Sequence, residues 1–583
     1  MSTQQSENPA SPRIETVLAA LGIAAIAILV FHPILDGRFL NWDDDRNFLS
    51  NESFRGLGAS QLAWAWRTFH LGVWQPLAWV LFGTQYELGG LDPRIYHAFS
   101  VGMHALCAAT LFLMAKTILD EAGRQAPAPV RTSAHGQRTS RANLIAAAIA
   151  ATLFALHPLR VEVVAWVSCQ PYLPSAFFCM LAVILYIRRH RDSNRPRRRI
   201  LSYFGVITCY LIALAFKAPA ITLPIVLLIL DVYPLRRVRA DSNQRSARAK
   251  HRFLALVWEK LPFIMVAVVV AFLAMKAKDV NESRMPFGEW KASERLAQSA
   301  YGVVFYLWKT IWPTGLSAFY ELPSSMNLMQ RPYFAAAIAS LALTAVCLVV
   351  VRRRAAPLAA WTAYLVILAP NLGMIQISQQ IAADRYAYLA TVPLFLLLAG
   401  AIRAAWNRPF RPVRAVVIAS VCVTCIALSF VARGEMRSWR NSESLWTAAL
   451  AVNPRCAHAH CALGQALASD AQTAPAGDRD KLLADAAAHL AESARLKPDF
   501  AFAYSNLGAV CLYAGRYDDA RAAYVRALDF ANQFASDELS RIHAGLAIAF
   551  SHLGDKEAAW QHIRLAQRLG LPPEQVERLL DLM

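Results

Sequence analysis

Three consecutive aspartates, Asp43, Asp44 and Asp45, follow the first long apolar run of the chain, in the sequence Asn41-Trp42-Asp43-Asp44-Asp45. Carboxylates at the boundary between a bilayer and water are costly to leave unpaired, and they usually mark a functional site. A carboxylate is also a common general base, which removes a proton from an attacking hydroxyl. The aspartates therefore predict chemistry at a membrane surface.

Other polar residues adjoin the ends of later apolar runs, and the expected topology places them at the same outer membrane face. Some have simple structural interpretations: His104 can be a packing residue, and Lys217 can cap a turn. Glu162 can pair with Arg160. Taken together, these residues place one carboxylate near several cationic side chains and beside an apolar surface. This combination suits transfer of a group from a lipid-linked phosphate. The candidates are Gln75, His97, His104, His157, Arg160, Glu162, Lys217, Asp384 and Arg385.

Such a transfer has few chemical requirements. Displacement at the anomeric carbon of a sugar by an alcohol needs a base for the attacking hydroxyl, and the departing phosphate needs positive charge and hydrogen-bond donors. Phosphate leaves readily as an anion, so the reaction needs no second carboxyl group as an acid, unlike glycoside hydrolysis. One aspartate with Arg, Lys or His side chains is sufficient.

The composition is that of a polytopic membrane protein. Of 583 residues, 56% are hydrophobic and only 17% are charged, and the mean hydropathy is +0.33. A soluble core cannot bury so many long apolar runs. The net charge of +19 comes largely from arginines between these runs, as in 188–199 and 236–252. Short basic loops follow the positive-inside rule, so this charge orients the protein and predicts no nucleic-acid partner.

The apolar runs form about eleven membrane spans if every basic loop is cytoplasmic. The N terminus then lies inside and the C-terminal region outside, in an inner (cytoplasmic) membrane. Several runs are shorter than the roughly 20 residues of an upright span, so ten or twelve spans also fit. The first run has no convincing cleavage site and is expected to stay as an anchor. The expected spans are 16–35, 95–118, 143–157, 172–187, 200–216, 218–234, 261–277, 333–351, 357–370, 386–402 and 414–432.

The apolar stretch 295–312 is not counted as a span, because both of its flanks are expected outside. We predict an interfacial helix that lies in the plane of the membrane rather than crossing it. Its aromatic residues are then expected at the depth of the lipid headgroups. These residues are Tyr301, Tyr306, Trp308 and Trp312.

From about residue 433 the chain is alanine-rich, with a pattern typical of tetratricopeptide repeats. Small and aromatic residues recur at matching positions after Leu507 and after Leu546, and an earlier copy starts at Leu463. Trp446 fits the second helix of a half repeat. The pattern predicts about three repeats in a short solenoid, which binds an extended peptide on its concave face or serves as a spacer or oligomerisation arm.

These patterns predict an all-α protein: a polytopic membrane helical bundle followed by a short repeat solenoid. The expected organisation is a cytoplasmic tail in 1–15, a multi-span membrane domain in 16–432 and an extracytoplasmic repeat domain in 433–583. Membrane lipids are therefore expected partners of the chain.

Signals for metals and disulfides are weak. Most of the ten cysteines lie in apolar runs, where they act as small hydrophobes. Cys456 and Cys461 are poorly spaced for a local disulfide. No zinc spacing, Walker loop or G-x-S-x-G motif occurs. Three adjacent aspartates direct their side chains apart and make a poor preformed cage, so we assign no metal and no certain cofactor, with a divalent cation left as an option.

Short motifs occur in a fixed order along almost the whole chain. They are Asn41-Trp42-Asp43-Asp44-Asp45, Trp74-Gln75-Pro76-Leu77, Tyr96-His97, Met103-His104, His157-Pro158-Leu159-Arg160-Val161-Glu162, Ala165-Trp166, Phe216-Lys217, Leu223-Pro224, Leu230-Asp231-Val232-Tyr233-Pro234, Asp384-Arg385-Tyr386-Ala387-Tyr388-Leu389, Trp439 and Leu445-Trp446. This ordered set resembles the transmembrane and tetratricopeptide-repeat O-mannosyltransferase-like proteins, which are C-type glycosyltransferases. It is most similar to their bacterial relatives.

The resemblance implies a C-type fold in which an acidic motif of the first outer loop supplies the base. It also implies inverting transfer of a sugar, such as mannose, from a polyprenyl-phosphate donor. By position, the catalytic base is Asp43 or Asp44, and Asp45 is a solvated neighbour. Gln75 departs from the family, whose eukaryotic members commonly have arginine there.

We therefore expect a membrane glycosyltransferase, with Arg160, Lys217 and Arg385 around the donor phosphate. The repeats are expected to present the hydroxyl acceptor, on a protein or a glycan. A non-catalytic membrane scaffold that works through its repeats is the alternative. A transporter is a third interpretation, but it predicts broken helices and ion-coupling residues near the membrane midplane.

Overall fold

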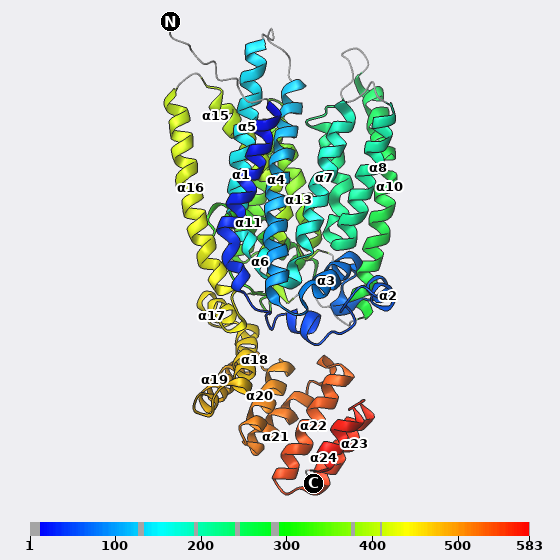
Figure 1. Ribbon diagram of the computed structural model, residues 1–583, viewed down its shortest axis with the longest axis vertical. Helices are drawn as coiled ribbons and strands as arrows, with labels where there is room; N and C mark the ends of the chain where they lie inside the picture. The colour runs from blue at the N-terminus through cyan, green and yellow to red at the C-terminus, as the bar shows by residue number, and fades with distance from the viewer. Residues whose placement is uncertain are drawn as a thin grey trace. The chain divides into compact units, whose positions relative to one another are not determined.

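The computed structural model describes residues 12–125, 133–191, 196–238, 245–280, 291–374, 379–408 and 411–581 (Figure 1). Residues 1–11 of the expected tail, and several residues of the arginine-rich stretches, lie outside these ranges. The chain divides into two compact units. The membrane unit comprises Met1–Arg38, Arg46–Leu316 and Leu322–Trp439, and the repeat unit comprises Phe39–Asp45, Ser317–Glu321 and Arg440–Met583.

Both units are mostly helical, as predicted. The helices of the membrane unit are α1 (Pro12–Phe31), α2 (Ala59–Arg67), α3 (Pro76–Gly89), α4 (Pro93–Arg124), α5 (Ser133–Ala155), α6 (Val161–Ala165), α7 (Tyr172–Arg191), α8 (Pro196–Phe216), α9 (Leu223–Val232), α10 (Arg245–Val280), α11 (Ala292–Ile311), α12 (Arg331–Val350), α13 (Ala356–Leu368), α14 (Ala387–Ala390), α15 (Val392–Trp406) and α16 (Arg411–Ser438). The helices of the repeat unit are α17 (Ser442–Val452), α18 (Ala457–Thr473), α19 (Ala476–Leu496), α20 (Ala501–Tyr513), α21 (Tyr517–Leu528), α22 (Ser536–His552), α23 (Lys556–Arg568) and α24 (Pro573–Leu580).

Shorter elements join these helices. The one-turn segments are η1 (His32–Asp36), η2 (Asp45–Leu49), η3 (His70–Gly72), η4 (Pro158–Arg160), η5 (Val167–Cys169), η6 (Ala218–Thr222), η7 (Ala369–Asn371), η8 (Asp384–Tyr386) and η9 (Ala531–Gln533). Two short strands are β1 (Tyr320–Glu321) and β2 (Gln380–Ala382). Strands therefore contribute little to the described fold.

Seven helices within the described ranges are long and apolar enough to cross a membrane, and two bent helix pairs raise the number to nine. The two other runs expected as spans form shorter apolar helices, Ala218–Val232 and Ala356–Asn371. The chain is thus a multi-pass membrane protein. Seven to nine candidates are fewer than the eleven spans expected, because these two runs fold into helices shorter than an upright span requires.

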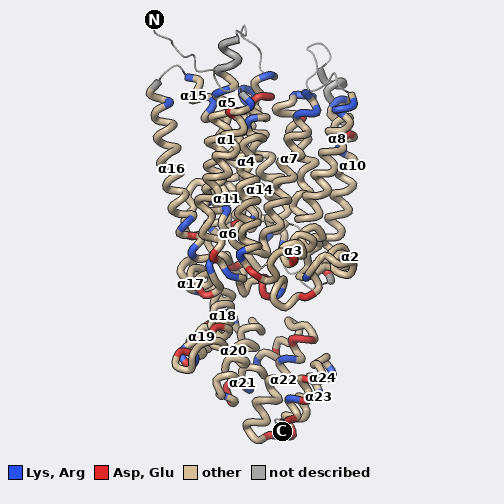
Figure 2. The backbone as a smooth tube through the Cα atoms, viewed as in Figure 1, with Lys and Arg blue, Asp and Glu red and all other residues tan. Residues whose placement is uncertain are grey.

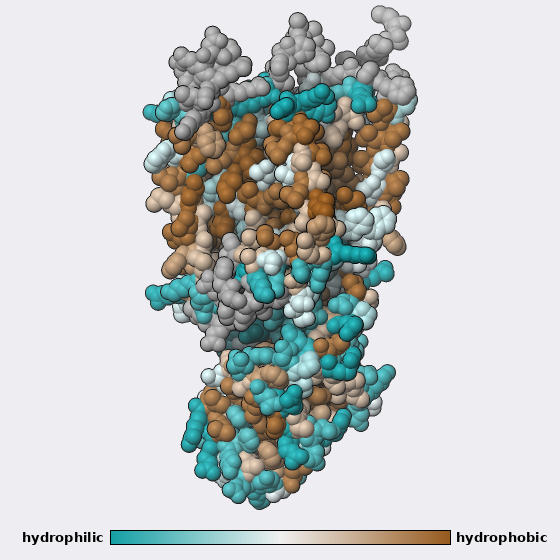
Figure 3. All heavy atoms as spheres, turned by 180° about the vertical axis from the view of Figure 1, so that it is seen from behind, coloured by the Kyte–Doolittle hydropathy of each residue, from teal (hydrophilic) through white to brown (hydrophobic). Residues whose placement is uncertain are grey.

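The outer surface of the membrane unit is strongly apolar. On α16, for example, Val423, Ile426 and Phe430 are 66%, 71% and 81% exposed. Figure 3 shows a brown belt of hydrophobic residues across this face of the helices, bordered by teal hydrophilic ones at both ends. Such a large apolar surface is unfavourable in water but matches the hydrocarbon of a bilayer.

Positive charge gathers at one end of the membrane unit, which we call the basic end. The last turns of α4, α7 and α15 carry Arg124, Arg189 and Arg403. Figure 2 shows the blue Lys and Arg segments concentrated at this end of the helices, whereas the opposite end carries both signs of charge. This asymmetry is the one that the positive-inside rule describes for a cytoplasmic face.

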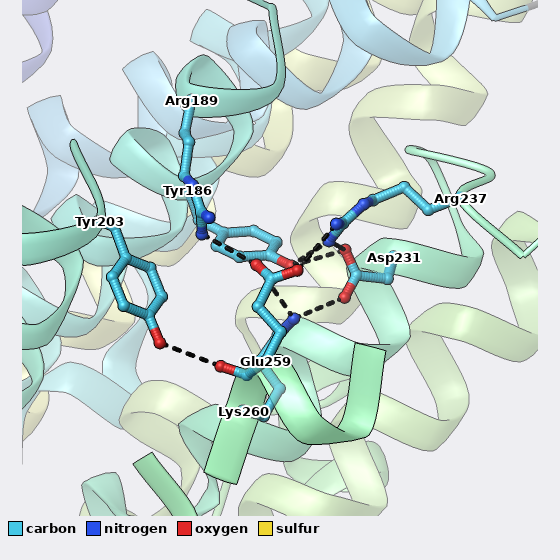
Figure 4. Close-up of polar contacts among 7 residues, drawn as sticks. All are labelled: Tyr186, Arg189, Tyr203, Asp231, Arg237, Glu259 and Lys260. Atoms are coloured by element: carbon cyan, nitrogen blue, oxygen red, sulfur yellow. Dashed lines mark hydrogen bonds and ion pairs between the residues drawn. The ribbon is translucent and has the colours of Figure 1, made fainter. Parts of the chain in front are cut away.

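A buried ion cluster fastens α7, α9 and α10 together at the basic end (Figure 4). Asp231 on α9 accepts hydrogen bonds from Lys260 of α10 and from Arg237, both at 2.8 Å, and from the Tyr186 hydroxyl at 2.6 Å. Arg237 also donates to Glu259 at 2.8 Å. Because the side chains of Asp231 and Lys260 are fully buried, each charge depends on its partner, and the cluster fixes how the helices meet.

Helix α11 covers the stretch expected at the interface. It is not among the candidate spans of the described residues. Trp308 and Trp312 are 58% and 59% exposed, but Tyr306 is only 1% exposed, and its hydroxyl accepts a hydrogen bond from the Ala383 amide at 3.0 Å. The Tyr306 ring therefore packs inward as part of the core, and the headgroup depth of these aromatic residues stays a prediction.

The repeat unit is a series of antiparallel helix pairs, α18 with α19, α20 with α21, and α22 with α23, preceded by α17 and followed by α24. Three pairs agree with the three repeats predicted. The ring of Tyr524 packs between two glycines: a Cβ atom would lie 2.8 Å from it at Gly508 and 2.6 Å from it at Gly545. Glycine is thus required where these helices approach closely.

All ten cysteines, each of which lies within the described ranges, are free thiols. Cys456 and Cys461 are both buried and do not form the disulfide that their sequence spacing already argued against. The repeat unit is therefore stabilised by helix packing rather than by a covalent link.

Candidate active site

The predicted base lies in the acidic segment Phe39–Asp45, which the structure assigns to the repeat unit. Asp44 is fully buried, and one of its carboxylate oxygens accepts a hydrogen bond from the Leu40 amide at 3.1 Å. Asp43 is partly exposed and has a φ of 62°, in the left-handed region that few residues other than glycine occupy. The turn therefore buries one carboxylate and leaves its neighbour accessible.

Asn41 attaches the acidic segment to the first helices of the repeat unit. Its amide donates to Ser442 Oγ at 2.9 Å, its side-chain Nδ2 donates to the Ala462 carbonyl at 2.8 Å, and its Oδ1 accepts from Trp446 Nε1 at 2.7 Å. The rings of Trp42 and Trp446 lie 5.1 Å apart. These contacts fix the backbone directly before Asp43, so the position of the aspartates depends on α17 and α18.

The segment Ser317–Glu321 packs on α18. The Phe319 ring stacks on His458 with centroids 4.8 Å apart, and His458 Nδ1 lies 2.9 Å from Glu321 Oε1. Burial alone raises the pKa of Glu321, but the contacts with His458, together with smaller contributions from Cys456 and Lys497, outweigh burial and hold the pKa below its usual value. Two sequence-distant segments are thus anchored on α17 and α18.

Lys217 and Arg385, two of the predicted phosphate ligands, line one small pocket of about 20 Å³ in the membrane unit, which we call the polar pocket after these two side chains although apolar residues complete its lining. Tyr172, Asn371 and Tyr386 also line it. Lys217 lies between α8 and η6, and Arg385 belongs to η8. The structure therefore brings these two cations together from segments more than 160 residues apart in the sequence.

Each cation of the polar pocket also has a protein partner. Lys217 Nζ donates to Gln75 Oε1 at 2.9 Å, so the glutamine that departs from the family motif lies at the site. Arg385 Nη1 and its backbone amide donate to the two oxygens of Glu162, at 2.5 and 2.7 Å. The interpretation that pairs Glu162 with Arg160 is therefore wrong. Asp384 precedes Arg385 and is 4% exposed.

Arg160 is fully buried and binds the chain itself. Its Nη1 donates to the carbonyls of Ala387 and Tyr388 at 3.1 and 3.2 Å, and its Nη2 donates to Thr391 Oγ1 at 2.7 Å. The guanidinium also lies 4.1 Å from the centre of the Phe154 ring. These contacts favour a positioning role, in which Arg160 holds the segment that follows Arg385, over direct contact with a phosphate.

The three predicted histidines are buried. His104 Nε2 donates to the Ala155 carbonyl at 3.0 Å, so in a neutral ring Nδ1 accepts from the Tyr388 hydroxyl at 2.8 Å. His157 Nε2 likewise donates to the Thr310 carbonyl at 2.9 Å, and its Nδ1 accepts from the Leu159 amide. His97 is 1% exposed and packs against Gly37, where a Cβ atom would lie 2.9 Å from Nε2. The contacts of His104 match its structural interpretation.

An apolar groove of about 610 Å³ adjoins the polar pocket, since Ile367 and Leu389 line both. The groove follows α9, α13 and α15, and α13 packs against the two others. Its lining is dominated by leucine, isoleucine, valine and alanine side chains. The two cations of the polar pocket thus lie beside a largely apolar groove of the membrane unit.

Comparison with known proteins agrees with the motifs. A tetratricopeptide repeat model matches residues 499–569. Protein O-mannosyl-transferase Tmtc1 of Drosophila melanogaster is 29% identical over 231 residues, 38% of this chain and 23% of that protein. Tmtc3 of the same organism is 21% identical over 498 residues, 78% of this chain and 52% of that protein. This chain is a distant relative of the TMTC protein O-mannosyl-transferases.

The human protein TMTC4 is also similar, with 24% identity over 208 residues, 34% of this chain and 26% of that protein. The chain thus spans about half the length of Tmtc3 and about a quarter of Tmtc1 and TMTC4. The predicted relationship to this family, and the predicted repeats, are confirmed.

Several residues at the polar pocket were not predicted from the sequence. Asn371 ends η7, and Tyr172 and Tyr386 complete the lining. An isolated asparagine directly after the apolar run 357–370 was a usable signal for Asn371. Tyr386 stands in the motif that begins at Asp384, which was a usable signal, whereas Tyr172 carried none, because aromatic residues are common at the ends of membrane spans.

Lys309 of α11 is a further cation that sequence patterns did not single out. Its Nζ donates to the carbonyls of Thr314 and Gly315, at 2.5 and 2.8 Å. Burial lowers the pKa of Lys309, and the negative charges of Asp384 and Glu435 act in the opposite direction. Within the described ranges, no group of three or more His, Cys, Asp or Glu side chains is arranged to hold a metal ion.

Proposed function

We propose that this chain is a membrane glycosyltransferase that moves a sugar from a polyprenyl-phosphate donor to a hydroxyl acceptor. One observation carries the proposal: the two cations of the polar pocket lie directly beside the apolar groove. A polyprenyl-phosphate sugar has the matching chemistry, with an anionic group at the end of a long hydrocarbon chain. The relationship to protein O-mannosyl-transferases supports the class of reaction and favours mannose as the sugar.

Lys217 and Arg385 hold the donor phosphate in this proposal. Each now binds a neutral or acidic partner, Gln75 or Glu162, and the pocket has room for about one water molecule. Donor binding therefore requires these side chains to rotate. Lys217 exchanges the Gln75 amide oxygen for a phosphate oxygen, which is a stronger, charge-assisted contact. The prenyl chain extends into the groove.

Asp43 is the base that we favour, and Asp44 shapes the turn. Asp43 is the more accessible of the two, whereas Asp44 is fully buried and accepts a backbone hydrogen bond. Strained backbone, such as the left-handed turn at Asp43, is often found at functional sites. Asp43 accepts the proton of the acceptor hydroxyl, the hydroxyl oxygen forms a bond to the anomeric carbon, and the bond from that carbon to the phosphate oxygen breaks. The phosphate leaves with the electron pair, and the sugar is inverted.

The repeats present the acceptor, which is a protein or a glycan. Helix pairs of this type leave a concave surface suited to an extended segment. The attachment of the acidic segment to α17 and α18 supports a link between acceptor presentation and the base. We further propose that the basic end faces the cytoplasm and that the repeats lie on the extracytoplasmic side of the inner membrane.

Donor binding tests the proposal at its central observation. The full chain, purified in detergent, is titrated with a fluorescent polyprenyl phosphate, and the variants Lys217→Gln and Arg385→Gln are compared with Lys276→Gln. Lys276 is exposed on α10 and lines neither the pocket nor the groove. We expect each pocket variant to bind polyprenyl phosphate about tenfold or more weakly, since a charged hydrogen bond contributes about 1.5–3 kcal/mol. Equal affinity in all variants contradicts the proposal and favours a non-catalytic scaffold.

A further inference from the structure

Four arginines line the end of the apolar groove that lies farthest from the polar pocket. Arg236 follows α9, Arg353 and Arg354 lie in the turn between α12 and α13, and Arg403 belongs to the last turn of α15. The groove lining contains no aspartate or glutamate. Three separate parts of the chain therefore place arginine side chains at the same end of the apolar groove.

Two of these arginines are held in place by backbone carbonyls at the C-terminal end of α4, one within the helix and one at the residue that caps it. Arg236 Nη1 donates to the Gln125 carbonyl at 2.7 Å, and Arg403 Nη1 donates to the Leu119 carbonyl at 3.3 Å. Neither contact neutralises the charge. Among the described residues, no salt bridge joins any of the four arginines to a carboxylate.

The neighbour of Arg236 shows the opposite behaviour. Arg237 binds both Asp231 and Glu259 in the ion cluster of Figure 4. Arg236 has a φ of 52°, a left-handed conformation that costs free energy for a residue with a side chain. The chain therefore turns sharply between two arginines, placing one among carboxylates and the other at the groove.

This end of the groove is remote from the proposed donor phosphate. On α13, Ala356 lies at the arginine end of the groove and Ile367 lies at the polar pocket. These residues are eleven positions apart, which is about 16 Å along a helix. A phosphate bound by Lys217 and Arg385 is therefore too far away to satisfy the four arginines.

We infer that this end of the groove is a binding site for an anionic phospholipid. The headgroup phosphate binds the arginines, whose planar guanidinium groups match phosphate oxygens, and an acyl chain enters the groove between α9, α13 and α15. The charge of the rim requires an anion, and the apolar lining requires hydrocarbon. A free phosphate has the negative charge but no hydrocarbon chain. A zwitterionic lipid has the hydrocarbon chains, but its headgroup carries no net charge.

The site goes beyond the proposed transfer reaction, because it needs neither the sugar donor nor the acceptor. Its bound lipid closes the groove at the basic end, while the donor enters at the other. Lipid binding at the arginines and donor binding at Lys217 are thus separately measurable properties of the same chain.

Lipid binding to the delipidated full chain in detergent tests the inference. Fluorescent phosphatidylglycerol and phosphatidylcholine are titrated in parallel, with inorganic phosphate as a competitor. The variants are Arg353→Gln with Arg354→Gln, and Arg403→Gln. Arg352→Gln is the matched control, because Arg352 is exposed in the same turn but does not line the groove.

We expect phosphatidylglycerol to bind at least tenfold more tightly than phosphatidylcholine. Removal of each lining arginine should lower the affinity for phosphatidylglycerol by about fivefold, as expected for a basic residue near an anionic lipid. Arg352→Gln should change the affinity less than twofold, and the thermal unfolding midpoint of the Arg403→Gln variant should stay within a few degrees of that of the unaltered chain, which shows that this variant is folded.

Three results overturn the inference. Equal binding of the two lipids shows that the headgroup charge is not recognised. An equal loss in Arg352→Gln shows a diffuse surface attraction rather than a site. Displacement of phosphatidylglycerol by millimolar inorganic phosphate shows a small-anion site without a role for the groove. Loss of polyprenyl phosphate binding in Lys217→Gln with intact phosphatidylglycerol binding separates this inference from the proposed function.

Discussion

At the scale of single residues, Arg160 and Arg385 show that two arginines of the same site can have different roles. The burial of each side chain and its hydrogen-bond partners indicate which role it has. Arg385 lines a pocket and shares its charge with Glu162. Arg160 has no exposed surface and donates to backbone carbonyls and to Thr391. A positive charge enclosed in this way stabilises the folded state, because its removal leaves several buried hydrogen-bond acceptors without a donor.

Arg160→Gln is therefore expected to destabilise the membrane unit by about 3 kcal/mol or more, since a glutamine cannot reach all of these acceptors. The measurement is the thermal unfolding midpoint of the purified chain in detergent. Arg331→Gln is the control, because Arg331 is exposed at the start of α12. Similar midpoints for the two variants contradict the positioning role of Arg160.

Individual pairings of this kind were not predictable from the sequence. Glu162 and Arg385 are separated by 223 positions, and Gln75 and Lys217 by 142. The residue types and their order marked both cations as candidates, but the partner of each depends on how distant helices pack. The partners of Arg160 were unpredictable for the same reason, because its motif does not reveal that Ala387 and Tyr388 turn their carbonyls toward it.

At the scale of elements, close helix packing explains why small residues recur in the repeats. Gly508 and Gly545 lie on either side of the Tyr524 ring, and a Cβ at either position would overlap it. The small and aromatic residues that recur after Leu507 and after Leu546 were enough to predict the helix pairs. The membrane helices were less predictable, because α9 and α13 are apolar but short, and hydrophobicity alone does not distinguish a short buried helix from a span.

Gly508→Ala is expected to destabilise the repeat unit by about 1–3 kcal/mol, because the added methyl group strains the contact with Tyr524. Gly477→Ala is the matched control, since a Cβ at Gly477 meets no atom within 4 Å. Limited proteolysis of α20 and α21 in the full chain measures the difference. Equal proteolysis rates would show that the two helices separate to accept the methyl group.

Asn41→Ala is expected to slow sugar transfer by about tenfold or more, because it removes three hydrogen bonds that fix the acidic segment on α17 and α18. At the same time, it should leave polyprenyl phosphate binding unchanged. Gln472→Ala, an exposed change on α18, is the control. A matching loss of donor binding would show that Asn41 supports the donor site instead of the base.

At the scale of the whole molecule, charge and hydropathy agree on a multi-pass membrane protein with one basic end. Composition and the arginine-rich stretches were sufficient for this prediction, because the bilayer imposes the same constraints on every such chain. The number of crossings could not be predicted from the same features. A bent pair such as Asp384–Ala390 with Val392–Trp406 can be counted as one membrane span or as none.

We expect this asymmetry to set the orientation of the chain, and reporters fused to the full chain test that expectation. We expect alkaline phosphatase to be active when fused after the last repeat, and a reporter that folds only in the cytoplasm to be active in the loop between α7 and α8. Removal of arginines from 188–199 should weaken this orientation. The opposite pattern of reporter activity contradicts a cytoplasmic basic end.

The rate of sugar transfer by Asp43→Asn tests the central claim most directly. The full chain is reconstituted in liposomes with a radiolabelled polyprenyl-phosphate sugar and an acceptor, and Asp36→Asn, an exposed change on η1, serves as the control. The proposed mechanism predicts a loss of about 10²-fold or more with donor binding preserved, as expected when a general base is removed without change of size. Transfer at the rate of the unaltered chain would contradict the role of Asp43 and the mechanism built on it.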